Sequence, residues 1–170
     1  MEAPARVLIT RAAADLLATL QRQHGPLMFH QSGGCCDGSS PMCYPDGDFV
    51  VGDRDILLGL LDVTGDRQPD GVPVWISGPQ FDAWKHTQLV IDVVPGRGGG
   101  FSLEAPEGVR FLSRGRAFTD AENQRLEAVP PVTGARYEAG ERPAGPRGEV
   151  VAEAADACPI PTGHAAQVPG

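Results

Sequence analysis

Short apolar segments, bounded by glycine, proline and aspartate, recur along this chain from Val7 to Leu112. Each is shorter than a typical core helix, and many are rich in the β-branched residues that strands favour. Because such segments outnumber the helical ones, we expect an α+β protein that is mainly β. The predicted strands are Val7–Ile9, Leu27–Gln31, Phe49–Val51, Ile56–Leu58, Val72–Ile76, Gln88–Val94, Phe101–Leu103 and Val109–Leu112.

Two helices are predicted among these strands. Thr10 is a suitable N-cap for a helix over Arg11–His24, where alanine and leucine recur at helical spacing. The pair Gly25–Pro26 then ends this helix, because glycine is favoured just past a helix and proline cannot continue one. Ser77 caps a second, shorter helix that starts at Pro79.

The composition changes after Phe118. Residues 119–170 are rich in proline, alanine, glutamate and glycine and contain few large apolar side chains. Such a segment buries too little apolar surface to offset its loss of conformational entropy, so we expect it to be disordered. A short helix over Glu122–Glu127 is the exception at the boundary. The predicted organisation is one globular domain at 1–118 and a disordered tail at 119–170.

Charge and hydropathy exclude several classes of partner. The net charge is -8 and Lys85 is the single lysine, whereas proteins that bind nucleic acid need clustered basic residues. No apolar run approaches the length of about 20 residues that spans a membrane, and the N-terminus lacks the pattern of a signal peptide. We therefore expect a cytoplasmic protein whose thiols stay reduced.

Three of the four cysteines fall between His30 and Tyr44, in a segment rich in glycine and serine. Thiolate and imidazole groups are ligands that favour zinc, iron or iron–sulfur clusters over magnesium or calcium. Glycines beside the cysteines permit a tight bend around an ion. The sequence therefore predicts a metal site, and its candidate ligands are Cys35, Cys36, Cys43, His30 and His86.

Other interpretations of these residues stay open. The cysteines are either ligands, a reactive or reversibly oxidised thiol pair, or buried packing residues. His30 is either a ligand or a hydrogen-bonded strand histidine, and His86 either a ligand or a cation at a helix end. Asp92 is either a buried acid or a solvent-facing residue of an edge strand. No catalytic residue is assigned, and a binding role is preferred to an enzymatic one.

Several stretches of the chain closely resemble an uncharacterised bacterial family, catalogued as domain of unknown function 779. These are Gly25–Gly38, Cys43–Pro45, Trp84–Gln88 and Ile91–Gly98, and the resemblance covers about residues 5–118. Genes of this family often lie beside those of acetaldehyde dehydrogenase. The resemblance thus implies an aldehyde dehydrogenase as a partner, which is an argument from association alone.

The order of the predicted elements is also similar to the A-type iron–sulfur carriers of the HesB/IscA type. The shared features are Gly33–Cys35 and Gly100–Pro106. This resemblance implies a compact β-rich fold in which Cys35 supplies one cluster ligand. The carriers have a further Cys-Gly-Cys pair near the C-terminus, which this chain lacks. Cys36, Cys43 or a histidine would then complete a mononuclear iron or zinc site.

The sequence therefore predicts an accessory protein that binds a metal ion or an iron–sulfur cluster through the loop of Cys35, Cys36 and Cys43. The expected content is one metal per chain, or one per homodimer. Two alternatives remain: a metal-free partner of an aldehyde dehydrogenase, and a small enzyme that depends on a thiol.

Overall fold

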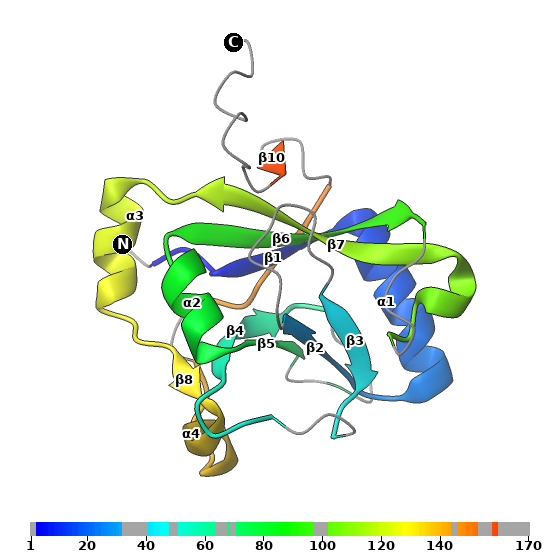
Figure 1. The fold of residues 1–170 in the computed structure, drawn as a ribbon, viewed down its shortest axis with the longest axis horizontal. Coiled ribbons are helices and arrows are strands. Elements are labelled where there is room, and N and C mark those ends of the chain that lie inside the picture. Colours follow the sequence, from blue (N-terminus) through cyan, green and yellow to red (C-terminus); the bar gives the residue numbers. More distant parts are fainter. Residues whose placement is uncertain are drawn as a thin grey trace.

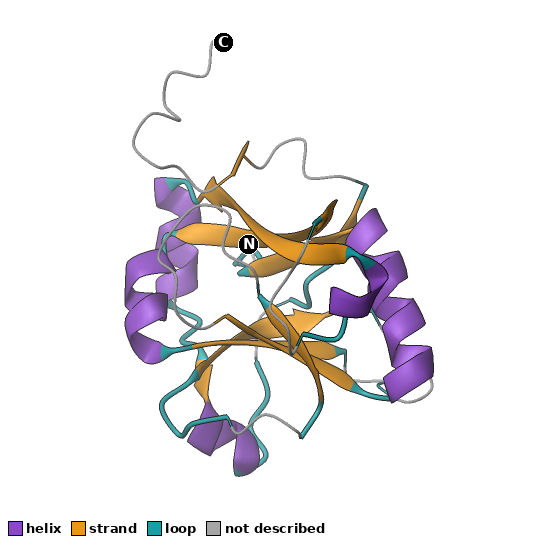
Figure 2. Cartoon of the chain, turned by 45° about the vertical axis from the view of Figure 1, so that its right-hand side comes forward, coloured by secondary structure: helices purple, strands orange, loops and turns teal. Residues whose placement is uncertain are grey.

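The structure, a computed structural model, describes residues 3–31, 41–47, 51–63, 68, 71–96, 102–143, 146–152 and 158–159. Two five-stranded sheets lie one above the other in Figure 1, and Figure 2 shows helices at both flanks. The prediction of an α+β fold that is mainly β is confirmed. None of the described helices is long and apolar enough to cross a membrane.

The first sheet has the strand order β10-β7-β6-β1-β9 and the second has the order β3-β2-β5-β4-β8. Their strands are β1 (Val7–Thr10), β2 (Leu27–Gln31), β3 (Met42–Pro45), β4 (Ile56–Leu61), β5 (Val72–Ile76), β6 (Thr87–Pro95), β7 (Val109–Ala117), β8 (Val132–Thr133), β9 (Val150–Val151) and β10 (Cys158–Pro159). The helices are α1 (Arg11–His24), α2 (Gly78–Trp84), α3 (Asp120–Glu127) and α4 (Gly134–Glu138), with a 3₁₀ turn η1 (Ala105–Glu107).

Helix α1 has the bounds that its sequence predicts. The Thr10 hydroxyl accepts a hydrogen bond from the Ala13 amide at 3.2 Å, which satisfies one of the free donors of the first turn. Gly25 ends the helix with a φ of 84°, a backbone conformation that glycine adopts without steric cost. Leu17 and Leu20 lie on the buried face, so α1 packs against the core between the sheets.

The main core lies between the two sheets. Phe29 of β2 and Phe111 of β7 are both fully buried, and their ring centroids are 4.9 Å apart at an interplanar angle of 87°. This edge-to-face arrangement is one that aromatic pairs prefer. Val7 and Ile9 of β1 and Leu89 of β6 belong to the same cluster. Alternate residues of β2 therefore anchor the second sheet to the first.

Strand β3 differs from the sequence prediction, which placed Cys43 in a loop with Cys35 and Cys36. In the structure β3 runs antiparallel to β2, and Phe29 pairs with Cys43. The turn-forming residues around it gave no signal for a strand, because β3 forms through its pairing with the buried strand β2. Two other predicted strands also differ. Ser102 and Leu103 precede η1 outside any strand, and Val51 lies in none, while Phe49, Val50 and Phe101 lie outside the described residues.

The C-terminal part of the described chain corrects the predicted boundary at residue 118. Residues 119–143 and 146–152 hold α3, β8, α4 and β9, whereas disorder was expected from residue 119 onward apart from a short helix over Glu122–Glu127, which α3 contains. Their few apolar side chains are buried in clusters shared with the rest of the domain. Leu126 joins Ala3 and Phe118, and the Tyr137 ring meets the Trp75 ring with centroids 5.3 Å apart. Strand β8 extends the second sheet and β9 the first.

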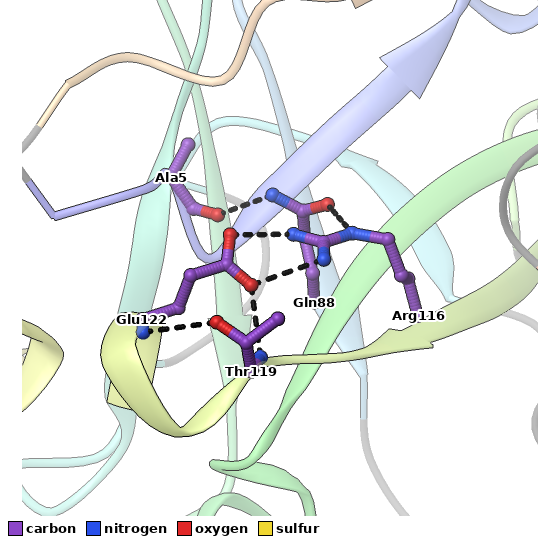
Figure 3. Close-up of polar contacts among 5 residues, drawn as sticks. All are labelled: Ala5, Gln88, Arg116, Thr119 and Glu122. Atoms are coloured by element: carbon purple, nitrogen blue, oxygen red, sulfur yellow. Dashed lines mark hydrogen bonds and ion pairs between the residues drawn. The ribbon is translucent and has the colours of Figure 1, made fainter. Parts of the chain in front are cut away.

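Polar contacts fix α3 to the first sheet (Figure 3). The Arg116 guanidinium donates to both carboxylate oxygens of Glu122 at 3.1 and 3.0 Å, and its Nε donates to Gln88 Oε1 at 3.1 Å. Gln88 in turn donates to the Ala5 carbonyl at 2.8 Å. Thr119 and Glu122 form a reciprocal capping box at the start of α3. These contacts join α3, β6, β7 and the N-terminal segment.

The ion pair between Arg116 and Glu122 should make the free energy of unfolding depend on pH. Hydrogen bonds from Arg116, and then from the Thr119 amide, lower the pKa of Glu122 from 4.5 to about 2. A lowered carboxyl pKa stabilises the fold fully above pH 4.5, and this contribution is lost as the pH falls to about 2. Urea unfolding of the Glu122→Gln variant over that range should show a shallower pH dependence than the wild type.

Glu127→Gln is the matched control, because Glu127 lies exposed on the same helix. This variant should keep the pH dependence of the wild type. Identical pH dependence in Glu122→Gln and the wild type would contradict the role of the Arg116–Glu122 pair.

Candidate functional site

Three side chains of different character meet at one end of the main core. They are Cys43 of β3, Ser102, and Glu104 at the start of η1, and we call them the Cys43 cluster. All three residues are buried. Along the chain the cluster adjoins residues 32–40 and 97–101, which lie outside the described residues. Cys35 and Cys36 belong to the first of these segments, so the structure does not place them.

Hydrogen bonds hold the cluster together. The Cys43 amide donates to Ser102 Oγ at 2.9 Å, and the Ser102 hydroxyl donates to the Glu104 carboxylate. The second oxygen of Glu104 accepts from the Phe111 amide at 3.1 Å. The Leu103 amide donates to the Cys43 carbonyl at 3.0 Å. These bonds tie the chain before η1 to the edge strand of the second sheet and to β7 of the first.

The electrostatics of the cluster favour a protonated thiol. Burial raises the pKa of Cys43 well above its ordinary value, and the nearby Glu104 carboxylate raises this pKa further. Glu104 is itself fully buried, and it makes no ion pair within the described part of the chain. A buried carboxylate without a cation is costly unless its hydrogen bonds compensate. A cation at this position would favour the thiolate form of Cys43 and would compensate the charge of the Glu104 carboxylate.

His30 points away from this cluster. Phe29 and Cys43 are directly paired, so their side chains share the face of the sheet that looks into the main core. His30 is the next residue of β2 and lies on the opposite face. There its Nε2 lies 3.0 Å from the Asp55 carboxylate. His30 and Cys43 therefore do not share a site, contrary to the ligand set predicted from the sequence.

His86 lies in a third place. It follows α2 at the surface, and its Nδ1 is 3.1 Å from the side-chain oxygen of Asn123 on α3. The described residues contain no group of three or more histidine, cysteine, aspartate or glutamate side chains arranged to hold a metal ion. Of the five predicted ligands, the structure thus separates three and leaves Cys35 and Cys36 undescribed.

Asp92 is neither an isolated acid nor a free edge residue. Its carboxylate accepts from Arg114 Nε at 2.7 Å and from the Thr10 hydroxyl at 2.9 Å. Although burial opposes the charge, hydrogen bonds from Arg114, Val93 and Thr10 lower the pKa of Asp92 overall. These contacts link the cap of α1 to β6 and β7, which is a structural role.

Sequence reasoning missed Ser102 and Glu104 as site residues. The two were noted only within the resemblance to Gly100–Pro106 of the iron–sulfur carriers. A serine and a glutamate beside proline and glycine are typical of an exposed turn. Only the contacts of this segment with Cys43 of β3 and Phe111 of β7 bury them.

Comparison with known sequences identifies a family. A family described as domain of unknown function (DUF779) matches residues 16–117, which is more than half of the 170-residue chain. Searches of the curated proteins and of the solved structures each gave no match. The likeness to HesB/IscA carriers and the association with an aldehyde dehydrogenase stay predictions. The matched range holds β2, β3, the Cys43 cluster and all of β7, so the protein belongs to the DUF779 family.

Proposed function

We propose that this protein binds one iron or zinc ion, or an iron–sulfur cluster, through Cys43 together with Cys35 and Cys36. The observation that carries the proposal is the buried pair of Cys43 and Glu104. A metal ion displaces the thiol proton, and its positive charge compensates the buried carboxylate. Thiolate sulfur is a preferred ligand of zinc and iron.

Chain connectivity supports the inclusion of Cys35 and Cys36. The segment that carries them follows Gln31 at the end of β2 and precedes Met42, the first residue of β3 and the neighbour of Cys43. An extended chain spans about 3.3–3.6 Å per residue, so the few residues between these cysteines and Cys43 limit how far apart they can lie. His30 and His86 are left out of the proposed ligand set because they lie elsewhere in the fold.

The same observations argue against Cys43 as a catalytic nucleophile. The thiolate is the reactive form of cysteine, whereas burial and Glu104 both favour the protonated thiol here. Glu104 is proposed as a neighbouring carboxylate that compensates the metal charge, either as a direct ligand or through its charge alone.

Elemental analysis of anaerobically purified protein tests this proposal. We expect about one iron or zinc per chain or per dimer, with acid-labile sulfide only where a cluster is bound. The Cys35→Ser and Cys43→Ser variants should each lose most of this metal. Because Cys43 is buried, circular dichroism and thermal unfolding must show that each variant is folded.

Cys158→Ser is the matched control, since Cys158 is on β10, which pairs with Gly115 and Arg114 of β7. It should retain the metal content of the wild type. Glu104→Gln keeps the shape of the side chain but removes its charge, and we expect it to bind metal more weakly. Wild-type protein without bound metal, or Cys35→Ser and Cys43→Ser variants with unchanged metal, would contradict the proposal.

A further inference from the structure

A cavity lies between α2 and α3, apart from the Cys43 cluster. Its volume is about 350 Å³, which is within the range of small-molecule sites. Residues from the start of β1, from α2 and from α3 line it, and both helices stand at the left of Figure 1. Neither the Cys43 cluster nor the residues of the proposed metal site contribute to this lining.

One side of the cavity is apolar and rigid. Phe81 and Leu126 belong to its lining, and two consecutive prolines after α3 extend the apolar surface. The Arg6 guanidinium lies 5.4 Å from the centre of the Phe81 ring. Its Nη2 donates to the carbonyls of Leu126 and Val129 at 3.2 and 2.9 Å, which fixes the position of the side chain. This wall is therefore held in place before any ligand arrives.

The remaining polar lining is rich in donors. Arg6 Nη1 and Nε, like the Lys85 ammonium, have no hydrogen-bond partner among the residues that the structure describes. His86 Nδ1 lies 3.1 Å from the Asn123 side-chain oxygen. Glu127 is the one acid among the described lining residues. In a chain of net charge -8, this cavity gathers the single lysine, a histidine and a partly buried arginine.

We propose that this cavity binds a small organic anion, a carboxylate or a phosphate carried on an apolar body. The anionic group pairs with Lys85 and the free donors of Arg6, and the apolar body packs on Phe81 and Leu126. Charge-assisted hydrogen bonds are stronger than neutral ones, so the cavity should bind an anionic ligand more tightly than a neutral ligand of the same shape. This inference is independent of the proposed metal site.

Isothermal titration calorimetry on the full chain tests the proposal with four probes. Benzoate and phenyl phosphate carry the two anionic groups on the same ring, benzyl alcohol lacks the charge, and inorganic phosphate lacks the apolar body. We expect saturable binding of benzoate or phenyl phosphate, and the tighter of the two identifies the anionic group. Benzyl alcohol and inorganic phosphate should bind much more weakly.

Two variants of equal charge locate the binding. Lys85→Gln should weaken binding of the tighter probe by about tenfold or more, as expected for the loss of a charge-assisted hydrogen bond. Arg11→Gln removes one positive charge from exposed α1, outside the lining, and should leave the affinity unchanged. Phe81→Leu should also weaken binding, because it removes the aromatic surface.

Three results would overturn the proposal. They are absence of saturable binding for both anionic probes, equal affinity for benzyl alcohol or inorganic phosphate, and equal weakening by Lys85→Gln and Arg11→Gln. Each of these outcomes leaves the metal content of the protein unaffected, so it is distinguishable from failure of the metal proposal.

Discussion

Replacing Phe111 with alanine is expected to lower the free energy of unfolding by about 3–5 kcal/mol. The ring is fully buried between the two sheets and meets the Phe29 ring edge to face, with centroids 4.9 Å apart. Its removal deletes buried apolar surface and leaves a cavity that the surrounding strands fill only partly. Urea unfolding followed by circular dichroism measures the change.

Phe81→Ala makes the same chemical change at a half-buried position on α2. It should cost less than Phe111→Ala, because part of the surface it removes is already in contact with water. Equal losses in the two variants would show that the sheets are not joined through the Phe29–Phe111 contact.

Ending the chain after Phe118 is the second large perturbation. This truncation removes α3, β8, α4 and β9, and with them the buried side chains of Leu126 and Val132 and the Tyr137 ring on Trp75. Burial of each large apolar side chain contributes about 1.5–3 kcal/mol, so the expected loss is roughly 5 kcal/mol or more. That loss is comparable to the whole stability of a small domain. We expect the truncated chain to lack a cooperative urea-unfolding transition.

A chain that ends after residue 152 is the matched control. It keeps all four helices and β9 and loses only the two-residue β10 among the described elements. This chain should unfold with nearly the free energy of the full protein. If the chain that ends at Phe118 unfolded with a free energy within about 1 kcal/mol of the full protein, residues 119–152 would be dispensable for the fold.

The C-terminal strands also change how the sheets end. Strand β8 pairs with β4 at the edge of the second sheet, and β9 pairs with β1 at the edge of the first. Between them the amide of Gly148 donates to the Leu60 carbonyl at 2.8 Å, and a side chain at this position would collide with the Val7 carbonyl. Covered edges resist pairing with other chains. The family match ends at residue 117, so these edges are closed by residues outside it.

The sequence alone was sufficient to predict the helix and the strands that depend on neighbouring residues. The Thr10 cap and the Gly25–Pro26 stop fixed both ends of α1, because capping and helix termination involve only neighbouring residues. Strands β2, β5 and β6 were predicted for a similar reason, since their apolar runs favour burial wherever they pack. The alternation of Leu27 and Phe29 with Met28 and His30 between two faces followed from strand geometry alone.

Only the tertiary structure decided which side chains meet. The register of β2 and β3 places Cys43 with Glu104 and sends His30 to Asp55, although His30 and Cys43 are close in sequence. Residues 119–143 and 146–152 are ordered because their few apolar side chains pack into clusters with distant parts of the chain, which local composition does not reveal. Pairing energies between distant segments depend on register and burial, and these properties exist only once the sheets are assembled.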